Sequence, residues 1–254
     1  MKKFKKSKKT GKIAAVIACR AFSTRLFAKP LQLVGNYTIL ELLIEQLKKS
    51  KQIDEFVLAI ADTPGSDLFI DFAKKNNLKY VIGDEVDVLE RLIHGAKKVS
   101  ANVIFRTTSE NPFIFWEGID NLITEHYQKN ADLSFYGNLP LGCSYEIINL
   151  DSLEYSHKYG KKKHKSEYSS LYIFENPKKF KIHRSIPQKN LRYPSYRLTV
   201  DTPEDLIVVR KIHEKLGKNK TPIPLVKIVS FLNSHKAILK INSKITLKYT
   251  RHAK

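Results

Sequence analysis

Five cationic or hydroxyl side chains follow an apolar run near the N-terminus, and they are of the types that bind phosphates. The run 13–19, IAAVIAC, is long enough for one buried strand. After it come Arg20, Ser23, Thr24, Arg25 and Lys29. Cations neutralise phosphate charge, while hydroxyls and loop amides donate hydrogen bonds to phosphate oxygens. The Walker and dinucleotide motifs, GxxxxGKS/T and GxGxxG, are absent from this stretch, so it predicts a phosphate loop of another type.

Apolar strands and amphipathic helices alternate through the first half of the chain. Their short connections predict a mainly parallel sheet with helices on both faces. Ligands of such sheets bind beyond the carboxyl ends of the strands. The loops after positions 19 and 107 are therefore expected at the same edge. The predicted strands are 13–19, 56–61, 79–82, 102–107 and 131–136, and the predicted helices are 39–49, 66–76, 87–98 and 116–129.

The second half has a less regular pattern. Helices are predicted at 150–157 and 166–174, and strands at 180–184 and 195–200. A helix is predicted from Thr202 or Pro203 to 216, because proline suits the first turn and acidic residues suit the positive end of the helix dipole. We predict a basic mobile tail at 1–12, a main domain at 13–216, and a C-terminal part at 217–254 with a linker, a helix at 225–232 and a loose end from 242.

Composition narrows the classes of protein. The chain has 254 residues, a net charge of +20 and two cysteines, so neither a disulfide framework nor a metal cluster is expected, and the cytoplasm is the expected location. Its apolar stretches are too short to span a membrane. The cationic start followed by VIAC also resembles an export signal, but the apolar run is at the lower limit of length and Arg20 follows it. The charge favours anionic partners.

The first loop carries a family resemblance. ACRAFSTRLFAKPL resembles the signature A-R-x-x-S-T-R-L-P-x-K of the cytidylyltransferases of surface-glycan synthesis, the spore-coat-polysaccharide and acylneuraminate type. The chain departs from the signature at Phe27, where the family usually has proline. The matching positions are Arg20, Ser23, Thr24, Arg25, Leu26 and Lys29.

Two further motifs imply a metal site. RTTSENPFI resembles the family's R-x-T-G-D-C-P-L-I, whose aspartate is a magnesium ligand; here Glu110 takes that position. RLTVDTPEDL resembles the C-terminal signature R-x-T-V-D-T-P-E-D-L, and Asp201 matches its metal-binding aspartate. Glutamate also binds Mg²⁺, but it is one methylene longer, so the metal or the loop must shift. The alternatives are a solvated Glu110 and a simple helix cap at Asp201 or Thr202.

Weaker matches imply further substrate contacts. DVLERL resembles a motif whose arginine, here Arg91, lies near the nucleotide, although a surface arginine on an amphipathic helix is equally compatible. GCSYE, with Ser144 and Glu146, resembles a segment near the acceptor. KSEYSSLYIFENP resembles a helix in which Glu167 matches and tyrosine replaces histidine. Arg106 matches the arginine that opens the first metal motif. Packing roles remain open for these segments.

The resemblance implies a GT-A-like nucleotide-diphospho-sugar transferase fold: an α/β fold with a mainly parallel mixed sheet between helices and a smaller β-rich lobe. It implies transfer of CMP from CTP to a small anionic acceptor, with release of pyrophosphate, Mg²⁺ as cofactor and a homodimer. Arg20, Arg25 and Lys29 would be the catalytic cations at the triphosphate. The acceptor stays open between a nonulosonic acid, a sugar or polyol phosphate, and a phosphonate.

Three other classes stay open. A glycosyltransferase of the same fold usually has a DxD motif, which the segment 84–87, DEVD, does not match in spacing. A nucleic-acid-binding protein would explain the charge, but helix-turn-helix, RRM and zinc-finger signatures are absent from the sequence. A relative without activity would explain Glu110.

Overall fold

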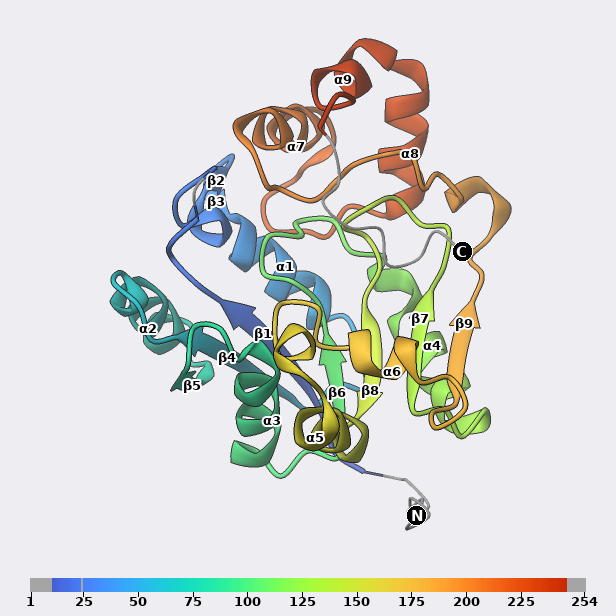
Figure 1. Ribbon diagram of the computed structural model, residues 1–254. Coiled ribbons are helices and arrows are strands. Elements are labelled where there is room, and N and C mark those ends of the chain that lie inside the picture. Colours follow the sequence, from blue (N-terminus) through green and yellow to red (C-terminus); the bar gives the residue numbers. More distant parts are fainter. Residues whose placement is uncertain (1–10, 24, 246–254) are drawn as a thin grey trace.

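The computed structural model describes residues 11–23 and 25–245. A seven-stranded mixed sheet runs through the centre in the order β5-β4-β1-β6-β8-β7-β9 (Figure 1). Every pair is parallel except the two that involve β8. Its strands are β1 (Ile13–Cys19), β4 (Glu55–Ala61), β5 (Lys79–Gly83), β6 (Val103–Arg106), β7 (Leu133–Tyr136), β8 (Glu146–Asn149) and β9 (Ile182–Ser185).

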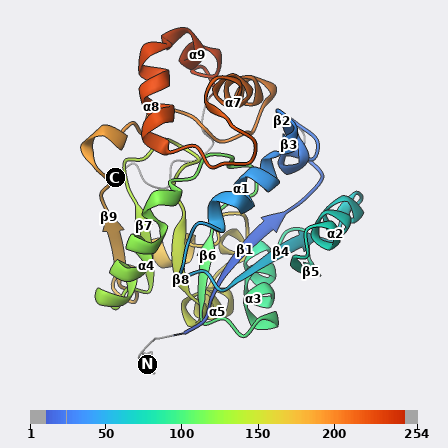
Figure 2. The same ribbon diagram turned by 180° about the vertical axis from the view of Figure 1, so that it is seen from behind.

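Helices cover both faces of the sheet because its central strands are apolar on both sides. Alternate residues of β1 enter two different hydrophobic clusters: Ile17 packs in one with residues of α1, α2 and α4, and Val16 packs in the other with residues of α3, α5 and α6. Figure 2 shows α1 and α4 in front of the sheet. The helices are α1 (Ile39–Leu47), α2 (Ser66–Lys75), α3 (Val88–Lys98), α4 (Ile119–Gln128), α5 (Leu150–Tyr159), α6 (Leu171–Glu175), α7 (Pro203–Leu216), α8 (Leu225–Ser234) and α9 (Lys236–Ile241).

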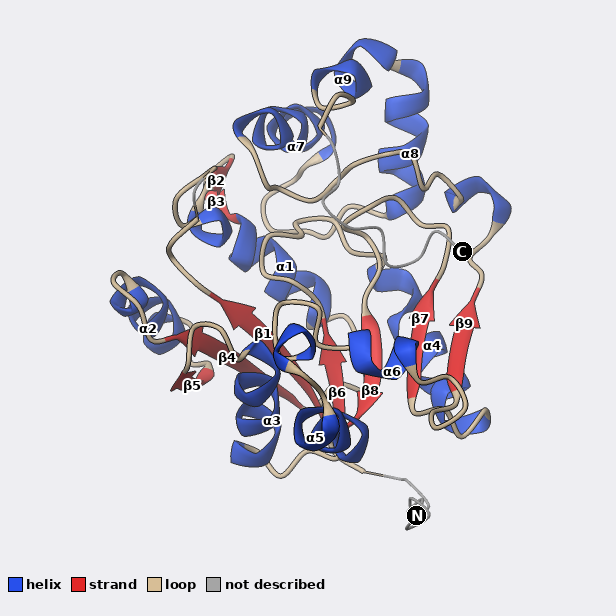
Figure 3. Cartoon of the chain, viewed as in Figure 1, coloured by secondary structure: helices blue, strands red, loops and turns tan. Residues whose placement is uncertain are grey.

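The end of the sheet toward which β7 and β9 run is capped by helices. There α7, α8 and α9 lie together at the top of the view (Figure 3). The small antiparallel pair β2 (Leu33–Val34) and β3 (Tyr37–Thr38) lies beside α7. Single-turn helices occur at Lys29–Leu31, Trp116–Gly118, Lys162–His164 and Lys189–Leu191. In the described residues the β-rich part of the smaller lobe is thus one short hairpin, and the remainder is helical.

The predicted alternation of strands and helices in the first half is confirmed, including the capping box in which Thr38 and Glu41 start α1. The second half contains the errors. The segment 195–200 was predicted as a strand, but it forms one isolated bridge, between Leu141 and Arg197. The helix predicted at 166–174 is limited to α6. The antiparallel strand β8 was not predicted, because four residues that start with a glutamate give too short an alternation to recognise.

The C-terminal end also differs from the prediction. A loose end was expected from 242, but Asn242 is 3% exposed and hydrogen-bonded, directly after α9. Most of the predicted tail, residues 1–10, lies outside the described residues. The part of the chain that the structure describes contains no helix with the length and apolar character needed to cross a membrane. The division into three parts, the homodimer and the cytoplasmic location remain predictions.

Candidate active site

The two loops predicted to share one edge of the sheet lie side by side. β1 and β6 are parallel neighbours, and a further bridge joins Ala18 to Thr108 at their carboxyl ends. The cationic loop after Cys19 and the acidic loop after Arg106 therefore leave the sheet together. This edge is the expected position of a ligand site in a parallel α/β sheet.

The cationic loop is closed at its base and presents Lys29 from a short helix. Ala28 N–H donates to Ala21 O at 2.8 Å, and Ala28 adopts a left-handed backbone with φ 43°. The chain then enters the single turn Lys29–Leu31, with Pro30 at its start. Only 13% of the Lys29 side chain is exposed, so its ammonium group is directed into the site and not into solvent.

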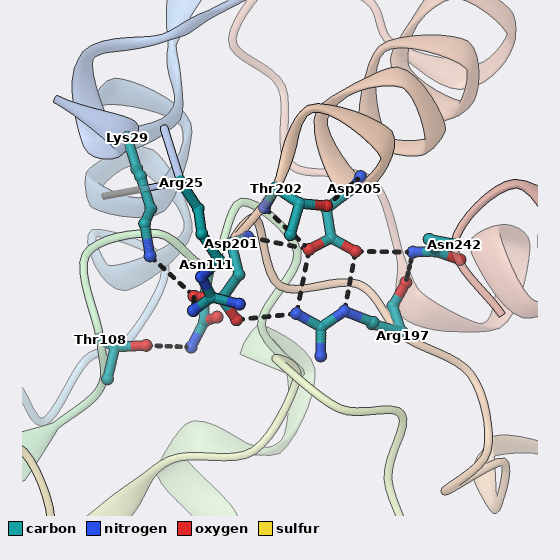
Figure 4. Close-up of polar contacts among 9 residues, drawn as sticks. All are labelled: Arg25, Lys29, Thr108, Asn111, Arg197, Asp201, Thr202, Asp205 and Asn242. Carbon is teal, nitrogen blue, oxygen red and sulfur yellow. Dashed lines mark hydrogen bonds and ion pairs between the residues drawn. The ribbon is translucent and has the colours of Figure 1, made fainter. Parts of the chain in front are cut away.

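Three cations surround Asp201 (Figure 4). Lys29 Nζ lies 2.7 Å and Arg25 Nη2 lies 3.3 Å from Asp201 Oδ1, while Arg197 Nη2 lies 2.8 Å from Oδ2. Burial alone would raise the pKa of Asp201, but these cations hold it below its ordinary value. Asp201 is therefore ionised, and both of its oxygens have cationic partners from the chain itself.

Asp201 does not cap the helix that follows it, so its side chain can pair with the three cations. Thr202, and not Asp201, is the N-cap of α7: its hydroxyl accepts from Asp205 N–H, and the Asp205 carboxylate accepts from Thr202 N–H. The same carboxylate accepts from Asp201 N–H at 2.9 Å. Arg197 donates to Asp205 through Nε and Nη2, at 2.8 and 3.0 Å. Of the two helix caps considered for this motif, Thr202 is the cap and Asp201 is not.

Glu110 lies beside the segment that carries Asp201. Val200 N–H donates to Glu110 O at 3.1 Å, and Ser109 Oγ lies 3.4 Å from Glu110 Oε2. Burial raises the pKa of Glu110 above its ordinary value; the charge of Asp201 acts in the same direction, and that of Lys29 opposes it. Glu110 is only partly exposed and is influenced by both charged residues, which speaks against a fully solvated surface glutamate.

The two carboxylates fit a hard divalent cation. Asp201 and Glu110 could provide oxygen ligands from adjacent backbone segments, and Lys29 acts on both as a positive charge. Among the described residues there is no group of three or more histidine, cysteine, aspartate or glutamate side chains that could hold a metal. This set matches Mg²⁺, which usually takes one or two protein carboxylates and completes its shell with water and phosphate oxygens.

Three residues predicted to bind substrate form a second cluster. Arg106 and Glu146 face each other on β6 and β8, with Nη1 and Oε2 3.5 Å apart, and both are buried. Arg106 Nη2 donates to Glu167 O at 2.8 Å, and Ser170 Oγ donates to Glu146 Oε1 at 2.7 Å. The Glu167 side chain is exposed. Arg106 and Glu146 are thus paired with each other inside the protein, and their contact with substrate remains a prediction.

The other predicted residues lie apart from these clusters. Arg91 is neither a surface arginine nor open to a ligand: it is 2% exposed and donates to Cys19 O and Ala59 O, which joins the ends of β1 and β4. Arg20 is half exposed and lies 4.0 Å from Glu85. Ser144 Oγ donates to Tyr136 O. Ser23 is partly exposed in the cationic loop, and Thr24 lies outside the described residues.

The sequence did not identify the residues that hold Asp201 in place. Arg197 was identified only as the start of the motif RLTVDTPEDL, Asp205 only as one of the acidic residues at the start of the predicted helix, and Asn242 was placed in a loose end. The motif T-x-x-D at 202–205 is a capping-box pattern and could have predicted the contact of Asp205 with the backbone. The hydrogen bonds to Asn242 span about forty residues of sequence and leave no local pattern.

The sequence of this chain is similar to those of known proteins over most of its length. The cytidylyltransferase family model matches residues 14–244. This chain belongs to that family. An uncharacterized protein of Methanocaldococcus jannaschii is 33% identical over 242 residues, which is 94% of this chain and 98% of the relative. The spore coat polysaccharide biosynthesis protein SpsF of Bacillus subtilis is 29% identical over 226 residues, 87% of this chain and 94% of the relative.

The fold agrees with the assignment to the cytidylyltransferase family. A cytidylyltransferase structure from Leptospira borgpetersenii superposes with a TM-score of 0.82 at 24% identity, over 94% of this chain and 99% of that one. The resemblance found in the sequence is therefore confirmed, and so is the mixed α/β nucleotidyltransferase fold. This cytidylyltransferase-family chain is an enzyme of the nucleotidyltransferase class.

Proposed function

We propose that this enzyme transfers CMP from CTP to a small anionic acceptor and releases pyrophosphate, in the synthesis of a surface-glycan precursor. The observation that carries the proposal is the meeting of Lys29 and Arg25 with Asp201, beside Glu110, at the carboxyl end of β1. Cations for a triphosphate and carboxylates for its metal ion are the groups that nucleotidyl transfer requires. The family and the spore-coat relative support cytidine and glycan synthesis.

The protein contributes position and charge. The acceptor oxygen attacks the α-phosphorus in line while pyrophosphate leaves, and negative charge increases on the phosphate oxygens. Lys29 and Arg25, joined by the exposed Arg20, would bind the triphosphate and stabilise that charge. Glu110 and Asp201 would hold Mg²⁺, which when bound supplies further positive charge at the phosphates.

Nucleotide binding changes the partners of Asp201. Lys29 and Arg25 are paired with this carboxylate. A triphosphate carries more negative charge than one carboxylate, so it draws both cations toward itself. Asp201 keeps Arg197, which fixes one of its oxygens, and offers the other to the metal. The cations and the carboxylate are thus already in the site before the substrate enters.

A nucleotide panel tests the proposal. CTP with Mg²⁺ should raise the melting temperature more than ATP, GTP or UTP, because a ligand stabilises the state that it binds. With an anionic sugar, sugar-acid or polyol-phosphate acceptor, pyrophosphate should be released from CTP well ahead of the other nucleotides. Equal response to all four nucleotides would contradict the choice of cytidine. Stabilisation by a nucleotide-sugar, without pyrophosphate release from CTP, would indicate a glycosyltransferase.

A further inference from the structure

Asn242 connects the C-terminal end of the described chain to the candidate site. Its Nδ2 donates to Asp205 Oδ1 at 2.9 Å and to Arg197 O at 3.1 Å. Figure 4 shows this amide on the far side of Arg197 and Asp205 from Asp201. One side chain therefore contacts both residues that fix the position of Asp201.

Asp205 is the centre of this network. It is 0% exposed, and its carboxylate accepts from two backbone N–H groups, from Arg197 and from Asn242. A buried ion pair is stable only when its remaining hydrogen-bonding groups are satisfied, because the interior does not solvate charge. Loss of one donor therefore weakens the hold on the whole carboxylate. Asp205 in turn holds Asp201 N–H and shares Arg197 Nη2 with Asp201 Oδ2.

The end of α9 depends on the same contacts. Each of the six residues of α9 keeps part of its surface exposed, whereas Asn242, the next residue, is buried. α9 packs against α7 and α8 through partly buried side chains such as Ile238 and Ile241. The hydrogen bonds of Asn242 are thus the specific link between this short helix and the start of α7.

We infer that Asn242 is a positioning residue for Asp201, which it orients through Asp205 and Arg197. The inference rests on the proposed function, in which Asp201 is a metal ligand. It assigns the C-terminal segment a part in metal-dependent nucleotide binding: the amide fixes the pair that holds Asp201 N–H and Oδ2. Direct partners of a metal ligand, as Asp205 and Arg197 would be, commonly affect metal affinity about 10–100-fold, and Asn242 acts through both of them.

Two substitutions separate hydrogen bonding from packing. Asn242→Ala removes both donor contacts, and Asn242→Asp keeps the shape but places a carboxylate against Asp205. Ser243→Ala is the matched control, because Ser243 is exposed and, among the described residues, bonds only locally, to Lys240 O. Calorimetry of the full chain gives the dissociation constant of CTP in EDTA and in MgCl₂. The dissociation constant in EDTA divided by that in MgCl₂ measures how much the metal strengthens CTP binding.

The inference predicts different changes for the two constants. In Asn242→Ala the CTP constant in EDTA should stay within about twofold, because Lys29 and Arg25 are intact, while the Mg²⁺-dependent ratio falls about tenfold. Asn242→Asp should lower the Mg²⁺-dependent ratio further, because the new carboxylate and that of Asp205 repel each other. Ser243→Ala should match wild type. CTP binding in EDTA also reports that each variant is folded.

Two results would overturn the inference alone. In one, Asn242→Ala lowers the melting temperature but leaves the ratio unchanged, which would make Asn242 an anchor of α9 only. In the other, Asn242→Asp binds Mg²⁺ and CTP like wild type, which would mean that its donor contacts have no effect. Wild-type protein that binds CTP equally in EDTA and in MgCl₂, or does not bind it, would overturn the proposed function and this inference with it.

Discussion

Asp201 and Glu110 lie on neighbouring backbone segments at one edge of the sheet, and their carboxyl groups are held in different ways. Asp201 has three cationic partners, and its pKa is below the ordinary value in spite of burial. Glu110 has hydroxyl neighbours, and burial raises its pKa. The cations thus favour the charged form of Asp201, whereas burial disfavours the charged form of Glu110.

The difference has a cause in the local sequence. Asp201 directly precedes a capping box, and Arg197 on the approaching segment completes a buried ion pair. Glu110 stands in a tight loop after β6, where a family aspartate would be one methylene shorter. Its longer side chain is desolvated within that loop. Asp201 is therefore the more firmly held charge of the site, and a bound cation would favour the charged form of Glu110.

The largest effect is expected from Asp201→Asn, which keeps the shape and removes the fixed charge. Turnover should fall about 10³-fold, the upper range for losing one preorganised charge contact. CTP in EDTA should bind at least as tightly as in wild type, because Lys29 and Arg25 lose their internal partner. Rate measurements at saturating Mg²⁺ and calorimetry in EDTA check both parts. Weakened binding in EDTA together with normal turnover would invert the assigned roles.

Glu110→Gln should have the next largest effect. Turnover should fall about 10²-fold, and the Mg²⁺ concentration for half-maximal rate should rise, because the amide binds the ion less well. Glu110→Asp should keep part of the activity, since it restores the family residue in a loop that fits the longer one. Glu45→Gln, an exposed glutamate paired with Lys48, is the control.

One contrary result would change the number of protein carboxylates assigned to the metal. If Glu110→Gln responds to Mg²⁺ like wild type while Asp201→Asn is inactive, the site uses one protein carboxylate.

Asp201 and Glu110 also show how much of the site could be predicted from the sequence. The motifs at 20–29, 106–114 and 197–206 led to the correct family, and the local signal of strand periodicity placed Glu110 just beyond β6. Asp201 was also predicted at a strand end, but the segment 195–200 forms an isolated bridge and no strand. The pairing of Lys29 with Asp201 joins positions 172 residues apart and was not predicted, because no local sequence pattern reports so distant a contact. The sequence also could not separate the buried Arg106–Glu146 pair from an open acceptor site, because the unpredicted strand β8 creates that pair.

Lys29→Ala and Arg25→Ala should have graded effects. Lys29 lies 2.7 Å from Asp201 and is mostly buried, whereas Arg25 lies at 3.3 Å with 42% of its side chain exposed. Solvent weakens the contribution of the more exposed charge. Turnover should fall on the order of 10²-fold for Lys29→Ala and about tenfold for Arg25→Ala. Both variants should melt close to wild type, because neither leaves a cavity in the core.

The order of these two effects is the test. A larger loss for Arg25→Ala would show that the ligand-free contacts do not predict the phosphate contacts. Lys48→Ala, on an exposed surface pair, controls for the loss of one positive charge.

The smallest effect is expected from a change of pH. This change distinguishes the behaviour of Glu110 from that of Asp201 most directly. A metal binds the deprotonated carboxylate, so protons compete with it. The pKa of Glu110 is raised above its ordinary 4.5, and that of Asp201 is lowered below 3.8. As pH falls from neutral toward 4.5, Glu110 therefore takes up a proton while Asp201 stays ionised. The apparent Mg²⁺ affinity in the presence of CTP should fall several-fold over that window, and Glu110→Gln should remove the dependence.

Stability without metal should change in the opposite direction for the two groups. Folded Glu110 binds its proton more tightly than unfolded Glu110, so its contribution is present below pH 4.5 and is lost as pH rises through the raised pKa. Asp201 contributes above pH 3.8, and this is lost only as pH falls through its lowered pKa. Denaturant titrations in EDTA should show Glu110→Gln gaining stability relative to wild type as pH rises from 4.5 toward neutral. A constant difference would mean that Glu110 ionises as in the unfolded chain, and the contrast between the two carboxylates would be lost.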